Sequence, residues 1–172
     1  MAIKLEHDSI EPSYLAEEFS LYNRLRSKKG FPRAYWYGRS THYSVLVMEL
    51  LGPSLEDVFY FCEKRFSIKT VSMLAEQMLS RLETLHNEGL LYKDISPRNF
   101  MLGTGNRQNT VYLADLGLVE EYELASDDCY NARVGLVGTP RYTSINGHRG
   151  GGTSLSNTNT LISDRCSSMY QG

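Results

Sequence analysis

A long amphipathic segment in the middle of the chain constrains the fold more than any other feature. Apolar residues recur there at intervals of three and four, which is the period of a helix buried along one face. They are Val71, Leu74, Ala75, Met78, Leu82 and Leu85. Ser67 can cap the start of this helix, and Gly89 can end it. The sequence therefore predicts a helix of several turns whose apolar stripe belongs to a core.

Two shorter helices are predicted on the same grounds. Residues 11–28 carry apolar side chains at helical spacing, with Pro12 in the first turn. A second set of apolar residues recurs on one helical face after the dipeptide Gly52-Pro53. The apolar positions are Leu15, Phe19, Tyr22 and Leu25 in the first helix, and Leu55, Val58, Phe59 and Cys62 in the second.

The N-terminal part of the chain has the composition of strands. Met1 to Leu5 is apolar except for one lysine and reads as a strand. Ala34 to Tyr37 and Tyr43 to Leu50 are rich in aromatic and β-branched residues, and Gly38 with polar neighbours separates them. Such a pair of runs predicts a β-hairpin.

Composition and these patterns together predict the fold class. The chain has 172 residues, of which 41% are apolar and 22% charged, as in a globular protein of one or two small domains. A strand-rich part extends to about Leu51, and the helical part follows Gly52-Pro53. We therefore expect an α+β fold.

Charge and cysteine content narrow the classes of partner and compartment. A net charge of −2 and a pI near 6.1 indicate no general attraction to nucleic acid or to a membrane surface, so any phosphate must be bound locally. Three widely spaced cysteines, Cys62, Cys129 and Cys166, favour a reducing compartment over a disulfide framework. Neither a bilayer-spanning apolar run nor a leader is recognisable. We expect an intracellular protein, cytoplasmic or nuclear.

The best candidate for a functional site runs from Leu91 to Asp115. Asp94 and Asp115 each follow apolar residues, and Asn99 lies between them. Carboxylates at the ends of apolar runs are held rigidly while they face solvent, which suits metal binding or acceptance of a proton. Asn99 has an alternative interpretation as a turn residue, because Pro97 is close to it.

These residues occur in the order found in the eukaryotic-type protein kinases, which the chain resembles. Two stretches, VMELLGPSLEDVFYFCEKRFSIKTVSMLAEQMLSRLETLH and GTPRYTSIN, closely resemble the casein kinase 1 family, and the resemblance extends from Ala2 to about His148. It implies a protein-kinase-like α+β fold with a partial small-lobe sheet, a helix C and a truncated helical large lobe. Residues 1–51 would be the small-lobe part and 52–148 the large-lobe part. Residues 149–172, rich in Gly, Ser, Thr and Asn, are expected to form a disordered tail.

The resemblance assigns ATP-binding roles in the first part of the chain. Lys4 resembles the strand lysine that contacts the α and β phosphates, and Glu18 resembles its ion-pair partner. Glu17 stands beside it, so a solvated acidic helix face is the alternative. Met48 would close the back of the adenine pocket, and Glu49 to Leu51 would form the hinge that binds adenine through its backbone.

The resemblance also assigns the catalytic roles. Asp94 would orient a substrate hydroxyl and accept its proton, while Asn99 and Asp115 would bind Mg²⁺ through oxygen. Thr139, in the Gly-Thr pair, would hydrogen-bond near Asp94 and shape the substrate platform. The implied cofactors are ATP and Mg²⁺, and the implied partners are proteins with serine or threonine acceptors. No oligomeric state is implied.

Several departures from the family pattern bear on activity. No glycine-rich loop precedes Lys4, and Ser96 stands where these kinases carry a lysine for the γ-phosphate. A lost cation there can slow turnover about a hundredfold or more. Tyr92-Lys93 replaces His-Arg, and Leu116 replaces phenylalanine after the magnesium aspartate; tyrosine and leucine can still pack.

Two further departures concern the substrate and the length of the match. The loop 130–137 keeps only Arg133 of the family's basic residues, so the resemblance does not imply the family's preference for acidic substrates. In the family, a helix that begins with acidic residues comes next. In this chain a segment rich in Gly, Ser and Thr stands in its place after His148. Two alternatives to an active kinase therefore stay open: a kinase-like binding module with impaired catalysis, and an incomplete gene product.

Overall fold

The structure is a computed structural model that describes residues 1–9, 13–121 and 138–142. The first part contains β1 (Ala2–His7), α1 (Tyr14–Arg24), β2 (Ala34–Arg39) and β3 (Tyr43–Met48). The second part contains α2 (Leu55–Phe61), α3 (Ile68–Asn87), β4 (Leu90–Tyr92), β5 (Phe100–Leu102), η1 (Gly105–Arg107), β6 (Val111–Leu113), β7 (Val119–Glu121) and η3 (Pro140–Tyr142). The predicted Pro12 start of the first helix, the loop 130–137 and the tail lie outside the described residues.

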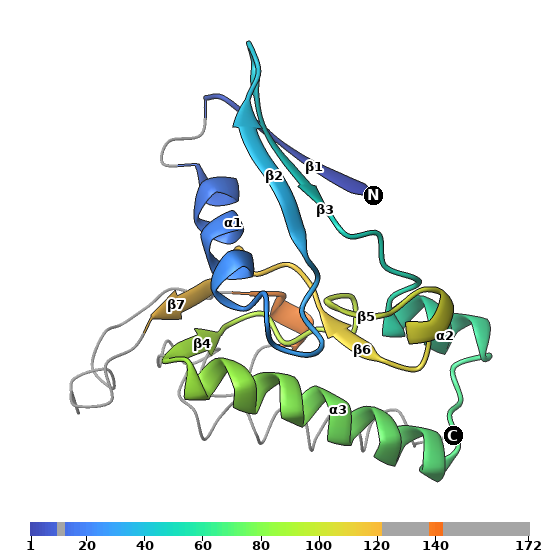
Figure 1. Ribbon diagram of the computed structural model, residues 1–172. Coiled ribbons are helices and arrows are strands. Elements are labelled where there is room, and N and C mark those ends of the chain that lie inside the picture. The colour runs from blue at the N-terminus through green and yellow to red at the C-terminus, as the bar shows by residue number, and fades with distance from the viewer. Residues whose placement is uncertain (10–12, 122–137, 143–172) are drawn as a thin grey trace.

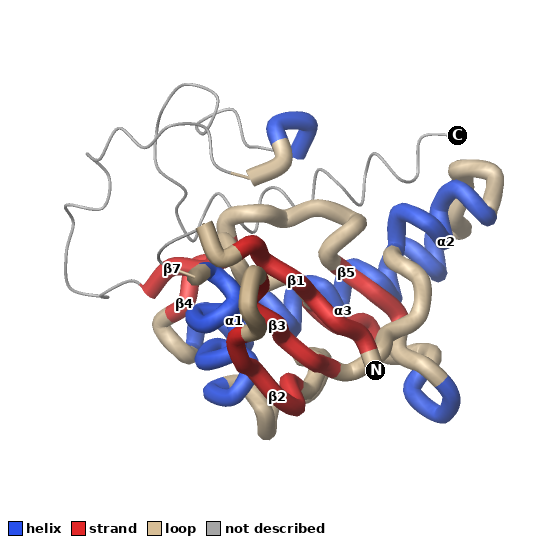
Figure 2. The backbone as a smooth tube through the Cα atoms, turned by 90° about the horizontal axis from the view of Figure 1, so that it is seen from above, coloured by secondary structure: helices blue, strands red, loops and turns tan. Residues whose placement is uncertain are grey.

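The N-terminal strands form a three-stranded antiparallel sheet in the order β1-β3-β2. Figures 1 and 2 show these strands side by side with α1 beside the sheet and α3 beneath both. Strand side chains alternate between faces, so Lys4 and Leu46, which pair across the sheet, share the face that α1 covers. Phe19 of α1 stacks on Tyr37 of β2 at a ring-centroid distance of 5.8 Å. The predicted strand at the N-terminus and the predicted hairpin are confirmed.

Two boundaries differ from the sequence-based prediction. Gly38 was expected between the strands, but it lies inside β2 and pairs with Val45. A side chain at this position would overlap the ring of Trp36, which explains how a glycine comes to stand inside a strand. The first helix ends at Arg24 instead of Lys28, because the chain turns there and the amide of Lys28 donates to the carbonyl of Leu25 at 2.9 Å.

The three predicted helices are all present. In α2, Ser54 and Asp57 form a capping box, in which each side chain accepts from the other residue's amide at 3.1 Å. In α3, Ser67 accepts from the amide of Thr70 at 3.1 Å, as expected for the cap. After α3 the chain turns at Gly89, whose φ of +71° is one that glycine adopts without strain. None of the described helices has both the length and the apolar character needed to cross a bilayer.

Short antiparallel strand pairs connect α3 to the site. β4 pairs with β7, and β5 pairs with β6. The apolar residues that precede Asp115 form β6, whereas β4, β5 and β7 were not predicted from the sequence. Two polar side chains of α3 bind the backbone of β6. Gln77 accepts from the amide of Val111 at 2.9 Å, and Arg81 donates to its carbonyl at 3.0 Å.

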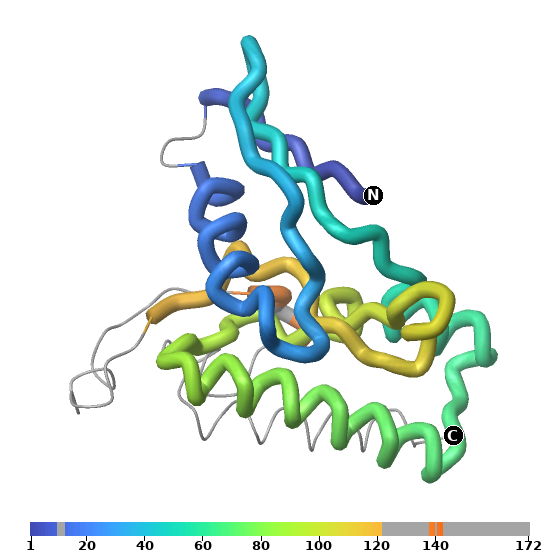
Figure 3. Tube along the Cα trace, in the orientation of Figure 1, coloured from blue at the N-terminus to red at the C-terminus, as the bar shows by residue number. Residues whose placement is uncertain are grey.

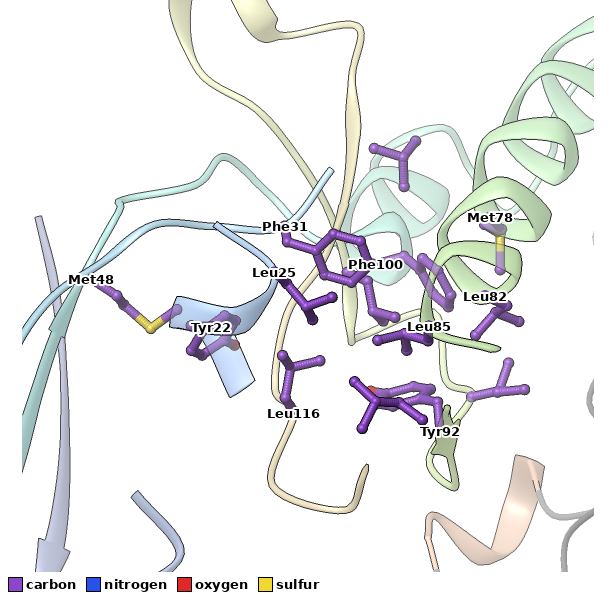
Figure 4. Packing of buried hydrophobic residues seen from close by; sticks show 14 of the residues in the cluster. Tyr22, Leu25, Phe31, Met48, Met78, Leu82, Leu85, Tyr92, Phe100 and Leu116 are labelled. Atoms are coloured by element: carbon purple, nitrogen blue, oxygen red, sulfur yellow. The ribbon is translucent and has the colours of Figure 1, made fainter. Parts of the chain in front are cut away.

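One hydrophobic core joins the two parts of the chain. Figure 3 shows the path of the backbone from the N-terminal strands into the helical part, and Figure 4 shows the packed side chains between α1 and α3. The labelled core residues are Tyr22, Leu25, Phe31, Met48, Met78, Leu82, Leu85, Tyr92, Phe100 and Leu116. Of the predicted α3 stripe, Val71, Met78, Leu82 and Leu85 are buried, so its assignment to the core is confirmed.

Leu82 provides a test of this core. Its side chain is fully buried, whereas Leu79 on the same helix exposes 41% of its surface. We expect Leu82→Ala to lower the free energy of unfolding by about 2–5 kcal/mol, because a cavity forms where apolar contacts were. Leu79→Ala should change it by less than about 1 kcal/mol. Urea denaturation followed by circular dichroism measures both, and equal losses would contradict the packing described.

Candidate active site

An ion pair between β1 and α1 brings together the first two predicted site residues. The ammonium of Lys4 donates to Glu18 Oε1 at 2.8 Å and to Oε2 at 3.0 Å. Glu18 is 2% exposed, while its neighbour Glu17 is exposed to solvent. The structure thus places Glu18, and not Glu17, against the lysine. The reason is register: Glu18 shares the buried face of α1 with Leu15 and Tyr22.

The same carboxylate binds the turn that follows β6. Glu18 Oε1 accepts from the hydroxyl of Tyr22 at 3.0 Å and from the amide of Leu116 at 3.1 Å. A carboxylate buried to this extent needs such donors, because an unpaired charge in the interior is strongly unfavourable. Four donated hydrogen bonds from three segments of the chain therefore hold α1, β1 and the turn together.

Asp115 lies in that turn, next to Lys4. Its Oδ1 accepts from the lysine ammonium at 2.9 Å, and its side chain is 55% exposed. The residue has a φ of +59°, a region that aspartate tolerates better than most residues and that often occurs at functional sites. Asp115 is therefore oriented by its backbone, with its carboxylate open to a ligand.

A second cluster surrounds Asp94. Asn99 donates from Nδ2 to Asp94 Oδ2 at 2.9 Å, and the amide of Thr139 donates to Asp94 Oδ1 at 2.7 Å. Gly138 precedes this contact with a φ of +88°, and a Cβ there would lie 2.6 Å from the carbonyl oxygen of Lys93. Only glycine allows the Gly-Thr segment to approach this closely. Thr139 reaches Asp94 through its backbone, so this contact does not need the threonine side chain.

The predicted adenine-pocket residues lie where β3 leads into the second part. Met48 is 5% exposed at the end of β3 and belongs to the core. The carboxylate of Glu49 accepts from the backbone amide of Arg33 at 3.1 Å and forms an ion pair with Arg107. Leu51 lies in the connector after β3. These two interactions hold the Glu49 side chain in place, which is consistent with recognition of adenine through the backbone of this segment.

The departures from the kinase pattern have distinct surroundings. Ser96 is 1% exposed, and its hydroxyl oxygen accepts from the amide of Arg98 at 3.4 Å. Its side chain supplies no positive charge. Lys93 is 7% exposed and pairs with Glu120 of β7. Tyr92 is buried, and its hydroxyl donates to the carbonyl of Asp115 at 3.2 Å.

Sequence reasoning missed the roles of two tyrosines and one glycine. Tyr22 was recognised only as an apolar helix position and Tyr92 only as a packing residue, while Gly138 was noted only as part of a pair. A hydroxyl four residues after Glu18 on the same helix face was the available signal for Tyr22. The other contacts join residues distant in sequence and leave no local pattern.

Burial and nearby charges shift the pKa values of Lys4, Tyr22 and Tyr92. Burial alone would lower the pKa of the Lys4 ammonium, but Glu18 and Asp115 outweigh burial and raise it above its ordinary value of 10.5. Lys4 is therefore a cation at neutral pH. Burial is the main reason that the pKa values of Tyr22 and Tyr92 lie well above 10.0, with nearby carboxylates adding to it. Both hydroxyls remain neutral.

The arrangement has the parts needed to bind an anionic ligand and a hard cation. Lys4 supplies positive charge, and Asp115 supplies exposed carboxylate oxygens. The side-chain nitrogen of Asn99 donates to Asp94. The side-chain oxygen is therefore the atom of Asn99 that could bind a cation. Asp94 is a carboxylate fixed at both oxygens, as suits a group that orients an acceptor. The residues fit a site for nucleotide phosphates and a divalent metal.

Comparison with known protein families agrees with this chemistry. The family model described as the protein kinase domain matches residues 1–145. The match includes every residue discussed in this site.

The buried tyrosines generate a pH prediction. A tyrosine with a raised pKa in the folded state stabilises the fold below its unfolded pKa of 10.0, and this contribution is lost as the pH rises further. Above about pH 10 we expect the free energy of unfolding to fall by about 1.4 kcal/mol per pH unit for each of Tyr22 and Tyr92.

Urea unfolding between about pH 8 and pH 11 measures this slope. Tyr22→Phe should reduce the slope, because the variant has one fewer group that ionises only on unfolding. Tyr14→Phe is the matched control, since Tyr14 is on the same helix but 54% exposed. An identical slope in wild type and Tyr22→Phe would contradict the burial of this hydroxyl.

Proposed function

The chain belongs to the protein kinase domain family, and on this premise we propose that it is a serine/threonine kinase similar to casein kinase 1. The proposed reaction transfers the γ-phosphoryl group of ATP to a serine or threonine hydroxyl of a protein. The observation that carries the proposal is the bridge from Glu18 through Lys4 to Asp115, with distances of 2.8 and 2.9 Å. It joins the proposed phosphate-binding lysine to the proposed metal ligand.

Lys4 would bind the α and β phosphates. Its ammonium is held from one side by Glu18, which is almost fully buried, so the cation is positioned before the nucleotide arrives. A fixed charge avoids the cost of reorganising the site when the reaction occurs. Asp115 shares the same ammonium and lies next to where the phosphates would bind.

Mg²⁺, when bound by Asp115 and Asn99, would neutralise charge on the phosphates. These two residues come from different segments: Asp115 follows β6, and Asn99 precedes β5. The carbonyl of Asn99 accepts from the amide of Ala114 at 2.8 Å, so the two segments are bonded directly beside the proposed metal ligands.

Asp94 would orient the substrate hydroxyl and accept its proton. Hydrogen bonds from Asn99 and Thr139 fix the plane of the carboxylate. The substrate oxygen would approach from the side left open by these two donors. The group acts mainly by positioning, as is usual in phosphoryl transfer.

The assignment to casein kinase 1 and to serine/threonine acceptors rests on two sequence stretches. The longer one contains the end of β3, all of α2 and α3 up to His86, and the shorter one contains Gly138 and Thr139. The two stretches contact each other, because the hydroxyl of Tyr142 donates to Glu56 Oε1 at 3.4 Å. The shorter stretch also reaches the site, where the amide of Thr139 donates to Asp94. Its likeness to the family therefore concerns residues beside the proposed substrate position.

A second candidate function is a kinase-like binding module without efficient catalysis. The observation in its favour is Ser96, a buried hydroxyl at the position where the related kinases carry a lysine. Without that cation, charge that develops on the transferred phosphoryl group is less stabilised. Such a module would bind ATP and Mg²⁺ but transfer little phosphate.

Phosphate transfer tests the first candidate. The purified chain should incorporate label from γ-labelled ATP and Mg²⁺ into dephosphorylated casein, on serine or threonine. We expect Asp94→Asn to lower the rate by about 100-fold or more, because the group that orients the hydroxyl and accepts its proton is lost. Asp8→Asn, an exposed aspartate outside the site, should retain the wild-type rate.

The outcomes separate the candidates. Equal incorporation by wild type and Asp94→Asn would overturn the catalytic role of Asp94. A thermal shift with ATP and Mg²⁺ but no transfer would support the binding module. Label on tyrosine alone would overturn the serine/threonine assignment.

A further inference from the structure

The backbone of Asp115 is held from both sides by buried tyrosine hydroxyls. On one side the amide of Asp115 donates to the hydroxyl oxygen of Tyr22 at 3.0 Å. On the other side the hydroxyl of Tyr92 donates to the carbonyl of Asp115 at 3.2 Å. Both tyrosine side chains have no exposed surface, and Figure 4 shows them in the core that includes Leu116.

The direction of each hydrogen bond follows from chemistry alone. The carboxylate of Glu18 can only accept, so the single hydroxyl proton of Tyr22 goes to Glu18 Oε1 at 3.0 Å. The amide of Asp115 can only donate, so it uses a lone pair of the same oxygen. Tyr22 is therefore a relay between the ion pair of Lys4 and the backbone of Asp115. A phenylalanine would fill the same space but could make neither bond.

This backbone needs such support because Asp115 has a φ of +59°. A non-glycine residue occupies that region only when surrounding contacts determine it. The neighbouring amides are also bound: Ala114 donates to the carbonyl of Asn99 at 2.8 Å, and Leu116 donates to Glu18 at 3.1 Å. The direction of the Asp115 carboxylate follows from the peptide that the tyrosines hold.

We propose that Tyr22 and Tyr92 are positioning residues that aim the Asp115 carboxylate at the metal site. The inference rests on the proposed function, in which Asp115 binds Mg²⁺. It adds that the metal ligand is coupled to α1 through Tyr22 and to β4 through Tyr92. A shift of either element would move the carboxylate even if Lys4 and Glu18 remained paired.

Tyrosine-to-phenylalanine variants separate positioning from packing, because they keep the ring and remove only the hydroxyl. The test variants are Tyr22→Phe and Tyr92→Phe. The matched control is Tyr112→Phe, since Tyr112 is 4% exposed in β6 but bonds neither Glu18 nor Asp115 through any described contact. Thermal unfolding of each variant verifies that it is folded. If one test variant does not fold, the other still tests the inference.

The first measurement is amide hydrogen exchange by NMR, which does not depend on activity. In Tyr22→Phe, the Asp115 amide should lose protection by about tenfold, the size of effect expected for one lost hydrogen bond. The Leu116 amide, which donates to Glu18, should keep most of its protection and serves as an internal control. Tyr112→Phe should change neither. Unchanged protection of the Asp115 amide in Tyr22→Phe would overturn the inference.

The second measurement is the Mg²⁺ concentration needed for half-maximal binding of a fluorescent ATP analogue. We expect it to rise about tenfold in Tyr22→Phe and in Tyr92→Phe, and to stay at the wild-type value in Tyr112→Phe. Normal Mg²⁺ dependence in both test variants would overturn the positioning role while leaving the proposed function intact. Failure of the wild-type chain to bind the analogue with Mg²⁺ would instead overturn the proposed function, and the positioning role with it.

Discussion

The buried carboxylate of Glu18 is the interaction on which the rest of the site depends. A charge at 2% exposure is stable only with donors around it, and here they come from β1, from α1 and from the turn after β6. Satisfying this one group therefore requires segments from both parts of the chain to meet. Burial of apolar side chains between α1 and α3 stabilises the contact between the two parts, and the carboxylate determines how β1, α1 and the turn are oriented.

The two aspartates of the site are held in different ways, which suit the different tasks proposed for them. Asp115 is aimed by its backbone, while its carboxylate stays exposed beside Lys4. Asp94 is instead fixed through its own oxygens by Asn99 and Thr139. A group that coordinates a cation needs open oxygens, whereas a group that orients a hydroxyl needs a fixed plane. The close approach of Gly138 makes the second arrangement possible.

The departures from the kinase pattern differ in their consequences for the site. Tyr92 replaces a histidine with a hydroxyl that donates to the carbonyls around Asp115, and Leu116 fills the adjoining core. Both side chains are buried beside the site. Ser96 is different, because a buried hydroxyl cannot supply the charge of a lysine. Efficient phosphoryl transfer thus depends on how well the other charged groups position the phosphates.

The sequence by itself determined the helices, the hairpin and the order of the candidate site residues, because apolar periodicity and caps are encoded in neighbouring positions. It assigned Glu18 as the partner of Lys4 only through the family resemblance, with a solvated acidic helix face as the alternative, and it gave no sign of β4, β5 and β7. Only the tertiary structure decided these points and the roles of the tyrosine hydroxyls. The physical reason is sequence separation: Glu18 meets an amide 98 residues away and Lys4 a carboxylate 111 residues away. No local pattern encodes contacts of that kind.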